Sequence, residues 1–440
     1  MLISFSAENF LSFRDKAELS MVAVESDHSL PNNRVEATFA KEKSQPLPLL
    51  KSAVFYGPNA GGKSNFLAAL NAFSAFVVNS ANMHENQPAS FPSFMLDPKK
   101  RTSPSEFEIR VLLNGVRFRY GFSADSKHVH DEWFFISETG RERFVFERTW
   151  NQDEMKHTFE FGPLGKRFEK IHRDGAIRSN ALLLSIASQS NIESAKNIVE
   201  YISRVGRKYT FDGSIEDTRY IPILTSALRF ADIGINSIIA TQQKQDSGSG
   251  TGFLESIIQI LPGTPEQRKH FSNWLFGRNK LEFVYSDTEG NEVALPASVQ
   301  SEGTYRFFTL MMQLSYIYVN GGGLLTIDEF DRSLHPVLCE AFINFIHQLP
   351  DARLQLICTT HNPLPLNQDI FRRDQVWIVE KDPSGASTLT ALSDFKGLRR
   401  EHRLGKQYLE GRFGGLPILD SSALEKMLQQ LAELSSKENH

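Results

Sequence analysis

The N-terminal part of the chain shows a strand pattern that passes into a helical one. Apolar and polar residues alternate through residues 1–57, and an apolar run at 51–56 closes this stretch. A glycine-rich segment follows, after which apolar residues recur at helical spacing: Phe66, Leu67, Leu70, Phe73 and Val77. A strand, a glycine loop and a helix in this order form a β-loop-α unit, so we expect a parallel sheet.

Residues 105–150 contain short strand-like runs separated by turn residues. The runs are 107–113, 116–120, 133–136 and 143–146. Short strands at this spacing are typical of an antiparallel meander.

From residue 179 onward the apolar spacing becomes helical. Helices are expected at 181–187, 197–203, 223–230 and 253–261, with a flexible loop at 242–252. These patterns are too short and too interrupted for a sustained heptad repeat, so no long coiled coil is expected. The order then predicted is strand 280–285, helix 304–319, strand 323–327, helix 336–348 and strand 354–359.

These elements together predict an α/β fold in which a mixed sheet with helices accompanies an antiparallel β meander. We expect one large unit from residues 1–175 and 276–400, a helical insertion at 176–275, and a C-terminal helical element at 401–440. The last helix carries an apolar stripe: Leu424, Met427, Leu428, Leu431 and Leu434. We expect the stripe to pack on the large unit, and docking on a partner is the alternative.

Composition narrows the possible classes of protein. The 440 residues include 48 Lys and Arg against 52 Asp and Glu, a net charge of −4, so nucleic acid would have to be held by local basic patches. Two cysteines, Cys339 and Cys358, are not expected to make a disulfide framework or a four-ligand zinc site. No apolar run approaches the about 18 residues that span a bilayer, and the N-terminus does not resemble a signal peptide. A cytoplasmic protein without membrane contact is expected.

The glycine-rich segment carries the clearest chemical motif. Gly57-Pro-Asn-Ala-Gly-Gly-Lys-Ser64 fits the P-loop pattern and lies between a predicted strand and a predicted helix, which is the context that the pattern requires. Backbone N–H groups of such a loop, with the positive end of the helix, bind phosphate oxygens. We expect ATP to be bound here by Gly57, Asn59, Gly61, Gly62, Lys63 and Ser64. Lys63 would reach the β- and γ-phosphates, and the Ser64 hydroxyl would coordinate Mg²⁺.

A second acidic motif follows a buried strand. The apolar run 323–327 ends in Asp328 and Glu329. We expect the strand to deliver Asp328 beside the P-loop, where it would help to hold Mg²⁺, and Glu329 to orient or deprotonate the attacking water. The alternative is a strand end with two solvated acids.

Two weaker features belong to the same picture. Ser301-Glu-Gly303 precedes a predicted helix, and its N-terminal turn is suited to bind a γ-phosphate. His361 ends the predicted strand at 354–359, at the sheet edge where ligands of α/β proteins gather. Taken alone, Ser301 reads as an ordinary helix N-cap and His361 as a structural histidine.

The order of these motifs resembles the ABC-type ATPase family: Walker A, a long insertion, a signature loop, Walker B and a switch histidine. Ser301 and Gly303 match the signature, Asp328 and Glu329 match Walker B with its catalytic glutamate, and His361 matches the switch histidine. The resemblance implies a P-loop ABC-type ATPase head that sandwiches ATP between two copies, with Ser301 and Gly303 acting on the nucleotide of the other copy. His361 would sense the γ-phosphate.

The sequence departs from the ABC-type pattern at two places. The position where that family has its D-loop aspartate holds His335, and no Q-loop glutamine is evident beyond the weak candidate Gln87.

Three segments resemble one branch of that family, the RecF/SMC-like stand-alone ATPases of bacterial abortive-infection operons. The segments are 8–15, 328–336 and 408–417. The branch is of the AbiLi/RloA type and includes the ATPase subunit of the PARIS anti-phage system. This resemblance implies a homo-oligomeric scaffold that controls a toxic effector protein encoded nearby, with a phage-derived protein or DNA as the trigger.

Other functional classes remain as alternatives. A RecF-like DNA-repair ATPase would bind DNA in an ATP-dependent way. A nuclease with a Toprim domain is disfavoured, because only about 80 residues follow His361, and a transporter subunit is disfavoured by the tail at 408–417. The basic clusters 99–101 and 399–403 read as solvated surface, and His128 with His130 reads as a poor metal motif.

Overall fold

The fold is taken from a computed structural model. It describes residues 1–40, 45–84, 87–89, 91–175, 177–205, 214–215, 217–231, 234–242, 279–351, 353–363, 366–397, 404–417 and 421–437. The helix expected at 253–261, the loop from residue 243 and the basic cluster 399–403 lie outside the described residues.

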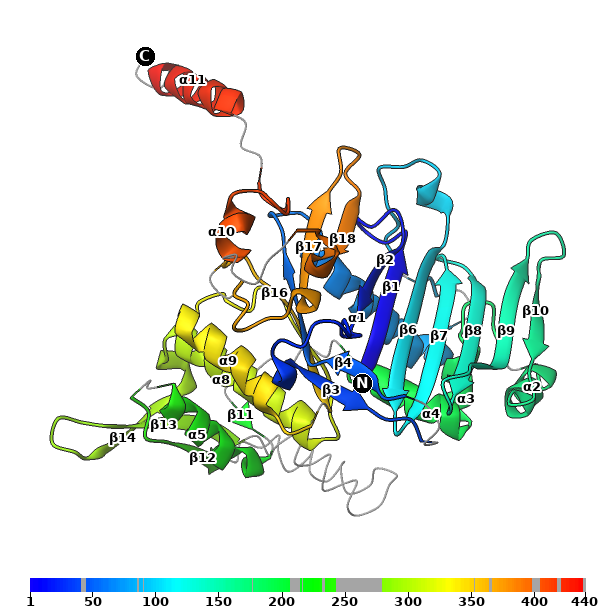
Figure 1. The fold of residues 1–440 in the computed structure, drawn as a ribbon, viewed down its shortest axis with the longest axis horizontal. Helices are drawn as coiled ribbons and strands as arrows, with labels where there is room; N and C mark the ends of the chain where they lie inside the picture. The colour runs from blue at the N-terminus through cyan, green and yellow to red at the C-terminus, as the bar shows by residue number, and fades with distance from the viewer. Residues whose placement is uncertain are drawn as a thin grey trace, which may run out of the picture.

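One layer is a seven-stranded antiparallel sheet (Figure 1). Its strands are β1 (Leu2–Glu8), β2 (Ala17–Ser20), β6 (Ser105–Leu113), β7 (Val116–Ala124), β8 (Val129–Ser137), β9 (Arg143–Asn151) and β10 (Lys156–Phe161). The order β10-β9-β8-β7-β6-β1-β2 follows the chain from β6 to β10, which confirms the predicted meander.

The second main sheet has five strands and is mostly parallel. They are β5 (Ser52–Tyr56), β15 (Gly323–Ile327), β16 (Leu354–Thr359), β17 (Val376–Lys381) and β18 (Ser387–Ala391), in the order β15-β16-β5-β17-β18. Only β18 is antiparallel to its neighbour. The carboxyl ends of β5, β15 and β16 therefore meet at one edge of the sheet.

Helix α1 (Lys63–Asn79) is held between the two sheets. The ring of Phe66 packs edge-on against Phe5 of β1, at 5.7 Å between centroids, and against Phe55 of β5, at 5.4 Å. Helices α3 (Leu183–Gln189) and α4 (Glu193–Ser203) cover α1, and Ser74 donates a hydrogen bond to the carbonyl of Ile202 at 2.7 Å. Helix α2 (Lys166–Arg173) follows β10 at the far end of the antiparallel sheet.

A second core lies under the other face of the parallel sheet. Helices α8 (Glu302–Val319) and α9 (Pro336–Gln348) pack on β15 and β16, and α5 (Ile221–Phe230) packs on α8. A small sheet packs beside α5. Its strands are β11 (Ser214–Ile215), β12 (Ser237–Gln242), β13 (Asn279–Ser286) and β14 (Glu292–Pro296). The two-stranded ribbon β3 (Arg34–Ala37) and β4 (Leu47–Leu50) lies near the N-terminus.

The predicted α/β fold class is confirmed, but the stretch 176–275 is not helical throughout. Strand β12 lies inside it and pairs with β13, starting with Ser237 opposite Val284. This strand forms because Ile238 is buried against a partner almost fifty positions away, which no local pattern reveals. The expected helices at 181–187, 197–203 and 223–230 are present as α3, α4 and α5.

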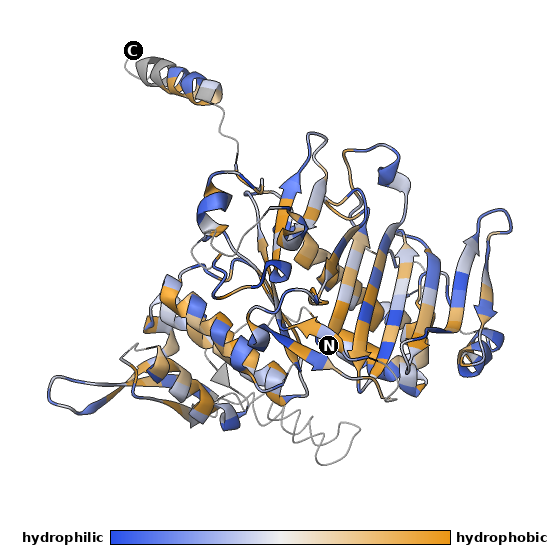
Figure 2. Cartoon of the chain, in the orientation of Figure 1, coloured by the Kyte–Doolittle hydropathy of each residue, from blue (hydrophilic) through white to orange (hydrophobic). Residues whose placement is uncertain are grey.

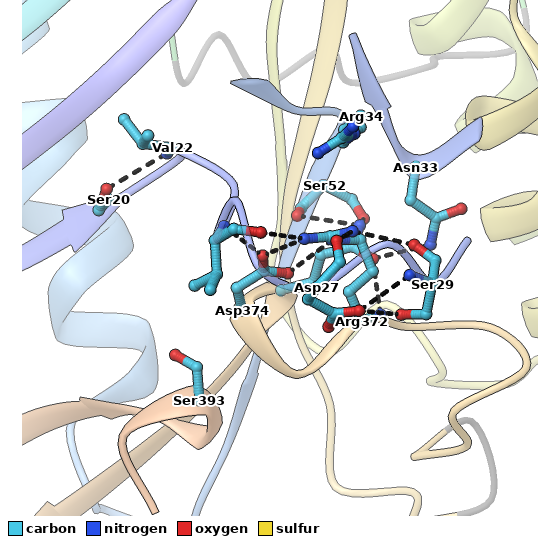
Figure 3. Close-up of polar contacts among 12 residues, drawn as sticks. Ser20, Val22, Asp27, Ser29, Asn33, Arg34, Ser52, Arg372, Asp374 and Ser393 are labelled. Atoms are coloured by element: carbon cyan, nitrogen blue, oxygen red, sulfur yellow. Dashed lines mark hydrogen bonds and ion pairs between the residues drawn. The ribbon is translucent and has the colours of Figure 1, made fainter. Parts of the chain in front are cut away.

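A buried arginine joins the N-terminal region to the parallel sheet (Figure 3). The Arg372 side chain is 1 % exposed and donates to both carboxylate oxygens of Asp374, at 2.9 and 2.6 Å. Its remaining nitrogen, Nη1, donates to the carbonyls of Asp27, at 2.7 Å, and Ser29, at 2.9 Å. A buried guanidinium with this many partners holds the loop before β3 against the start of β17.

The C-terminal part forms α10 (Leu404–Leu409) and α11 (Ser421–Lys437). Helix α11 stands apart from the rest of the molecule (Figure 1), and it carries apolar as well as polar positions (Figure 2). Leu424, Met427, Leu428 and Leu431 are 49–56 % exposed, so the expectation that this stripe packs on the large unit is wrong. An amphipathic pattern shows that a helix has an apolar face but does not say what covers it. Within the described residues, no helix has both the length and the apolar character needed to cross a membrane.

Candidate functional site

The P-loop segment joins β5 to α1 and is tightly packed from behind. Gly57 and Gly62 have φ angles of +153° and +118°, which favour glycine. A Cβ on Gly57 would collide with the carbonyl of Val379 in β17, and one on Gly62 would collide with the hydroxyl of Ser387 in β18. Asn59 lies in the exposed turn of the loop, and Gly61 is buried.

Lys63, the first residue of α1, folds back over this loop. Its ammonium donates to the carbonyls of Gly57, at 2.8 Å, and Pro58, at 3.1 Å. Burial lowers the pKa of Lys63 to about 8, and the nearby carboxylates, first Asp328, oppose that shift. A buried ammonium group at the N-terminus of a helix is well suited to bind phosphate oxygens.

A short chain of hydrogen bonds connects three separate elements at this edge. The Ser64 hydroxyl donates to Oδ1 of Asp328 at 3.1 Å, and the Thr359 hydroxyl donates to the same oxygen at 2.6 Å. The N–H of Glu329 donates to the Thr359 hydroxyl at 2.8 Å. The sequence-predicted residues Ser64 and Asp328 are thus in contact, and Thr359 is a member of the site that the sequence did not reveal.

The donor set of Ser64 and Asp328 fits Mg²⁺, which prefers oxygen ligands. Within the described residues, no group of three or more His, Cys, Asp or Glu side chains is arranged to hold a metal. These two observations agree, because Mg²⁺ bound with a nucleotide takes only one or two protein ligands and completes its shell with phosphates and water.

Glu329 has a backbone conformation that is uncommon for a residue with a side chain. Its φ is +47°, in the left-handed region. The bond from its N–H to Thr359 maintains this conformation, and its carboxylate is 50 % exposed. Strain of this kind is concentrated at functional sites, so the geometry is consistent with the role expected for this residue.

The segment expected to be the signature loop is tied to the acidic motif in the same chain. Arg306 donates to the carbonyls of Asp328 and Glu329, both at 3.2 Å. A Cβ on Gly303 would approach the carbonyl oxygen of Ser333 to 2.7 Å, so a larger residue would force the two segments apart. Arg306 was not identified from the sequence, because its partners lie more than twenty positions away.

Ser301 and His361 are placed near this centre but are not joined to it by hydrogen bonds in the described residues. Ser301 is exposed and caps α8, where its hydroxyl accepts from the N–H of Thr304 at 3.1 Å. Within one chain Ser301 is therefore an N-cap. His361 follows β16, and its pKa is lowered by partial burial and by the charge of Lys63, while Asp331 and Glu329 oppose this shift.

Two serines distant in sequence support the loop. The Ser387 hydroxyl donates to the carbonyl of Gly61 at 2.7 Å and lies 2.8 Å from the hydroxyl of Ser12, from which it can accept. Asn65 of α1 donates to the same Ser12 hydroxyl at 2.7 Å. Ser12 lies in the segment 8–15, which entered the sequence analysis only through a resemblance.

The C-terminal segment 408–417 also lies against the P-loop. The Tyr408 hydroxyl donates to the carbonyl of Gly415 at 2.9 Å, and its ring packs edge-on against Tyr56, the last residue of β5. Glu380 of β17 accepts from the N–H of Gly415. Burial raises the pKa of Tyr408, and the N–H of Gly57 opposes that shift. This segment therefore forms part of the support for the loop.

Two departures from the ABC-type pattern have clear structural roles. His335, at the D-loop position, is the N-cap of α9 and accepts from the N–H of Val337 at 3.3 Å. The weak Q-loop candidate Gln87 is bonded to His84 and Asn180.

Known structures with a similar arrangement include heads of SMC proteins. The "SmcHead bound to the C-winged helix domain of ScpA" is 11 % identical, with 89 % of this chain and 97 % of that chain covered and a TM-score of 0.39. The "SMC head domain from Thermotoga maritima" is 12 % identical, with 89 % and 98 % covered and a TM-score of 0.35. An Smc head domain with an extended coiled coil, "derived from Pyrococcus furiosus", is 11 % identical, with 89 % and 96 % covered and a TM-score of 0.38.

Sequence comparison gives the family. No curated protein matches the chain. The sequence profile of the family described as "AAA domain, putative AbiEii toxin, Type IV TA system" matches residues 52–367, a range that begins with β5 and includes the P-loop, Asp328, Glu329 and His361. The chain belongs to this family of P-loop ATPases.

Proposed function

We propose that this protein binds and hydrolyses ATP at the carboxyl edge of its parallel sheet. The observation that carries the proposal is the hydrogen-bonded chain from Ser64 through Asp328 to Thr359, beside the Lys63 ammonium. Gly57, Asn59, Gly61 and Gly62 would present the loop backbone to the phosphates.

The residues divide the catalytic work by position. Ser64 and Asp328 would hold Mg²⁺, which neutralises phosphate charge when bound. Lys63 would exchange its carbonyl partners for β- and γ-phosphate oxygens. Glu329 would orient the attacking water in line with the γ-phosphate, and His361 would contact that phosphate. Positioning and charge neutralisation supply most of the catalysis in phosphoryl transfer.

We further propose that two copies assemble through their heads, in the ABC-type manner. Ser301 is exposed at the N-terminus of α8, an 18-residue helix, and Ser301 with Gly303 would contact the ATP bound by the other copy. Arg306 and Gly303 fix this turn relative to Asp328 and Glu329, so a change at one bound nucleotide would be transmitted to the turn that contacts the other.

The biological role that we propose is control of a separate toxic effector in cytoplasmic anti-phage defence. It is supported by the resemblance of segments 8–15, 328–336 and 408–417 to ATPases of abortive-infection operons. The exposed apolar stripe of α11 is available to a protein partner, either the effector or a phage-derived trigger.

The test is the solution mass of Glu329→Gln, measured by light scattering with and without ATP and Mg²⁺. We expect the mass to double with ATP, because this variant should hold ATP without cleaving it. Adding Ser301→Arg should abolish the increase while leaving ATP affinity within about twofold, and Lys63→Ala should lose ATP binding itself. A single-copy mass under both conditions would contradict the head-to-head assembly.

A further inference from the structure

A pocket lies at the outer end of the seven-stranded sheet, far from the P-loop. It has a volume of about 530 Å³, within the about 300–1,000 Å³ range of small-molecule sites. It is lined by side chains from β9, β10 and α2 and from the turn before β8. The residues that matter here are His128, Trp150, Lys156, His157, Phe159 and His172.

The walls of this pocket are flat rings. His128 stacks on Trp150 with centroids 4.5 Å apart and planes 21° apart, and His157 lies 4.6 Å from the same indole. Phe159 and His172 lie 4.2 Å apart on the adjacent wall. Aromatic rings that line a pocket can contact another planar aromatic group with a face or an edge.

The imidazole of His157 is held rigidly and without charge. Its Nε2 donates to the carbonyl of Val129 at 2.7 Å, and a nitrogen of Arg148 lies 3.4 Å from its Nδ1. Burial, followed by the charge of Arg148, lowers its pKa to about 4. The ring is therefore neutral near pH 7 and adds an apolar stacking face.

The charges around the pocket suit an anionic ligand. Among the described residues that line it there is no acidic side chain, and Lys156 is at its rim, paired with exposed Glu154 at 2.7 Å. An exposed pair of this kind is weak and can be exchanged for a phosphate. Helix α2, which contributes His172, also carries exposed Lys166, Arg167, Lys170 and Arg173, but none of these four lines the pocket and Arg173 is paired with Glu169.

We propose that this pocket binds a nucleobase against its aromatic rings, with the attached phosphate held by Lys156. Aromatic faces beside basic side chains are the elements by which proteins bind single-stranded nucleic acid. The same base and phosphate occur in free nucleotides, so the experiment must separate the two sources. The site is independent of the ATPase proposed above, because it shares no residue with it.

The test uses the full-length chain carrying Lys63→Ala, which removes nucleotide binding at the P-loop from the measurement. Binding of a labelled 20-nucleotide single strand is followed by fluorescence anisotropy, and binding of AMP and UMP by isothermal titration calorimetry. We expect Trp150→Ala to weaken binding at least about fivefold and Trp150→Phe to stay within about twofold of the parent. The matched control is Phe230→Ala, because Phe230 is a 71 % exposed aromatic on α5.

The two sources give different results. Binding of the strand but not of the mononucleotides identifies single-stranded nucleic acid, and in that case Lys156→Glu should reduce the salt dependence by about one released ion. Equal binding of AMP or UMP identifies a free nucleotide. No binding of either ligand at physiological salt, or a Trp150→Ala protein that melts and binds like its parent, would overturn the proposal.

Discussion

At the scale of single residues, the site depends on backbone atoms as much as on side chains. The unusual φ of Glu329 is maintained by Thr359 on one side and by Arg306 on the other, through the N–H and the carbonyl of the same residue. Arg306 is half-buried, and burial lowers its pKa, with Arg332 adding to the shift. Among the described residues, its Nε has no hydrogen-bond partner. A role in positioning Glu329 explains why a charged arginine is half-buried at position 306.

If Arg306 positions Glu329, then Arg306→Ala should slow ATP hydrolysis more than it weakens ATP binding. We expect kcat to fall about tenfold or more, because a small displacement of a positioned water is costly, while ATP affinity changes less than about twofold. Arg306→Lys should recover part of kcat, since a lysine keeps a cationic donor. Single-turnover hydrolysis and equilibrium binding of ATP measure the two quantities. Equal losses in kcat and affinity would instead indicate a general loss of structure.

At the scale of elements, the sequence predicts the succession of strands and helices along the chain. It does not predict which elements that are distant in sequence contact one another. Strands β15 and β16 and helix α9 have the predicted bounds, because each has a clear apolar period and a clear stop. The P-loop and Asp328 were placed together because parallel strands bring their carboxyl ends to one edge.

The members that were missed have their partners far away in sequence. Ser387 reaches Gly61 across 326 positions, and Thr359 reaches Asp328 across 31. A serine or threonine at the end of a strand is too common to single out by itself. Likewise β12 and the free face of α11 depend on what lies next to them, which a local period does not encode.

The support behind the loop predicts the effect of Ser387→Ala. The change would leave the buried carbonyl of Gly61 without its hydroxyl donor, which typically costs about 1–3 kcal/mol. We expect both the melting temperature and the ATP affinity to fall. Ser384→Ala, at an exposed position in the turn before β18, serves as the control in thermal unfolding and ATP titration. A change that is equally large in both variants would contradict a specific role for Ser387.

At the scale of the whole molecule, one buried histidine links stability to pH. His347 lies in the last turn of α9 and is 3 % exposed, and its Nε2 is 2.8 Å from the hydroxyl of Ser52 in β5. Burial, with the charge of Lys51 as the smaller cause, lowers its pKa to about 3 from 6.5. The folded protein therefore keeps this ring neutral at a pH where the unfolded chain binds a proton.

The difference in proton binding by His347 makes the folded protein less stable at acidic pH. As pH falls from about 6.5 toward 3, the unfolded state gains a proton that the folded state lacks, so the free energy of unfolding decreases by up to about 1.4 kcal/mol per pH unit. His347→Gln, which retains a polar group beside Ser52, should remove this part of the slope. Urea unfolding between pH 7 and 4.5 measures it, with exposed His84→Gln as the control. Parallel slopes for the His347 variant and wild type would contradict the assignment.

Helix α11 gives the last prediction, because the described side chains of its apolar stripe belong to neither of the two large cores. Leu428 and Leu431 are 56 % and 55 % exposed, so Leu428→Glu with Leu431→Glu should leave the melting temperature within about 1 °C and the ATPase rate unchanged. Exposed apolar stripes associate, so the same change should reduce any increase in mass with protein concentration seen by light scattering. Leu314 lies on the buried face of α8, so Leu314→Glu should unfold the protein and serves as the comparison. If the α11 variant were also destabilised, the helix would have to pack on the head in solution, as the sequence alone suggested.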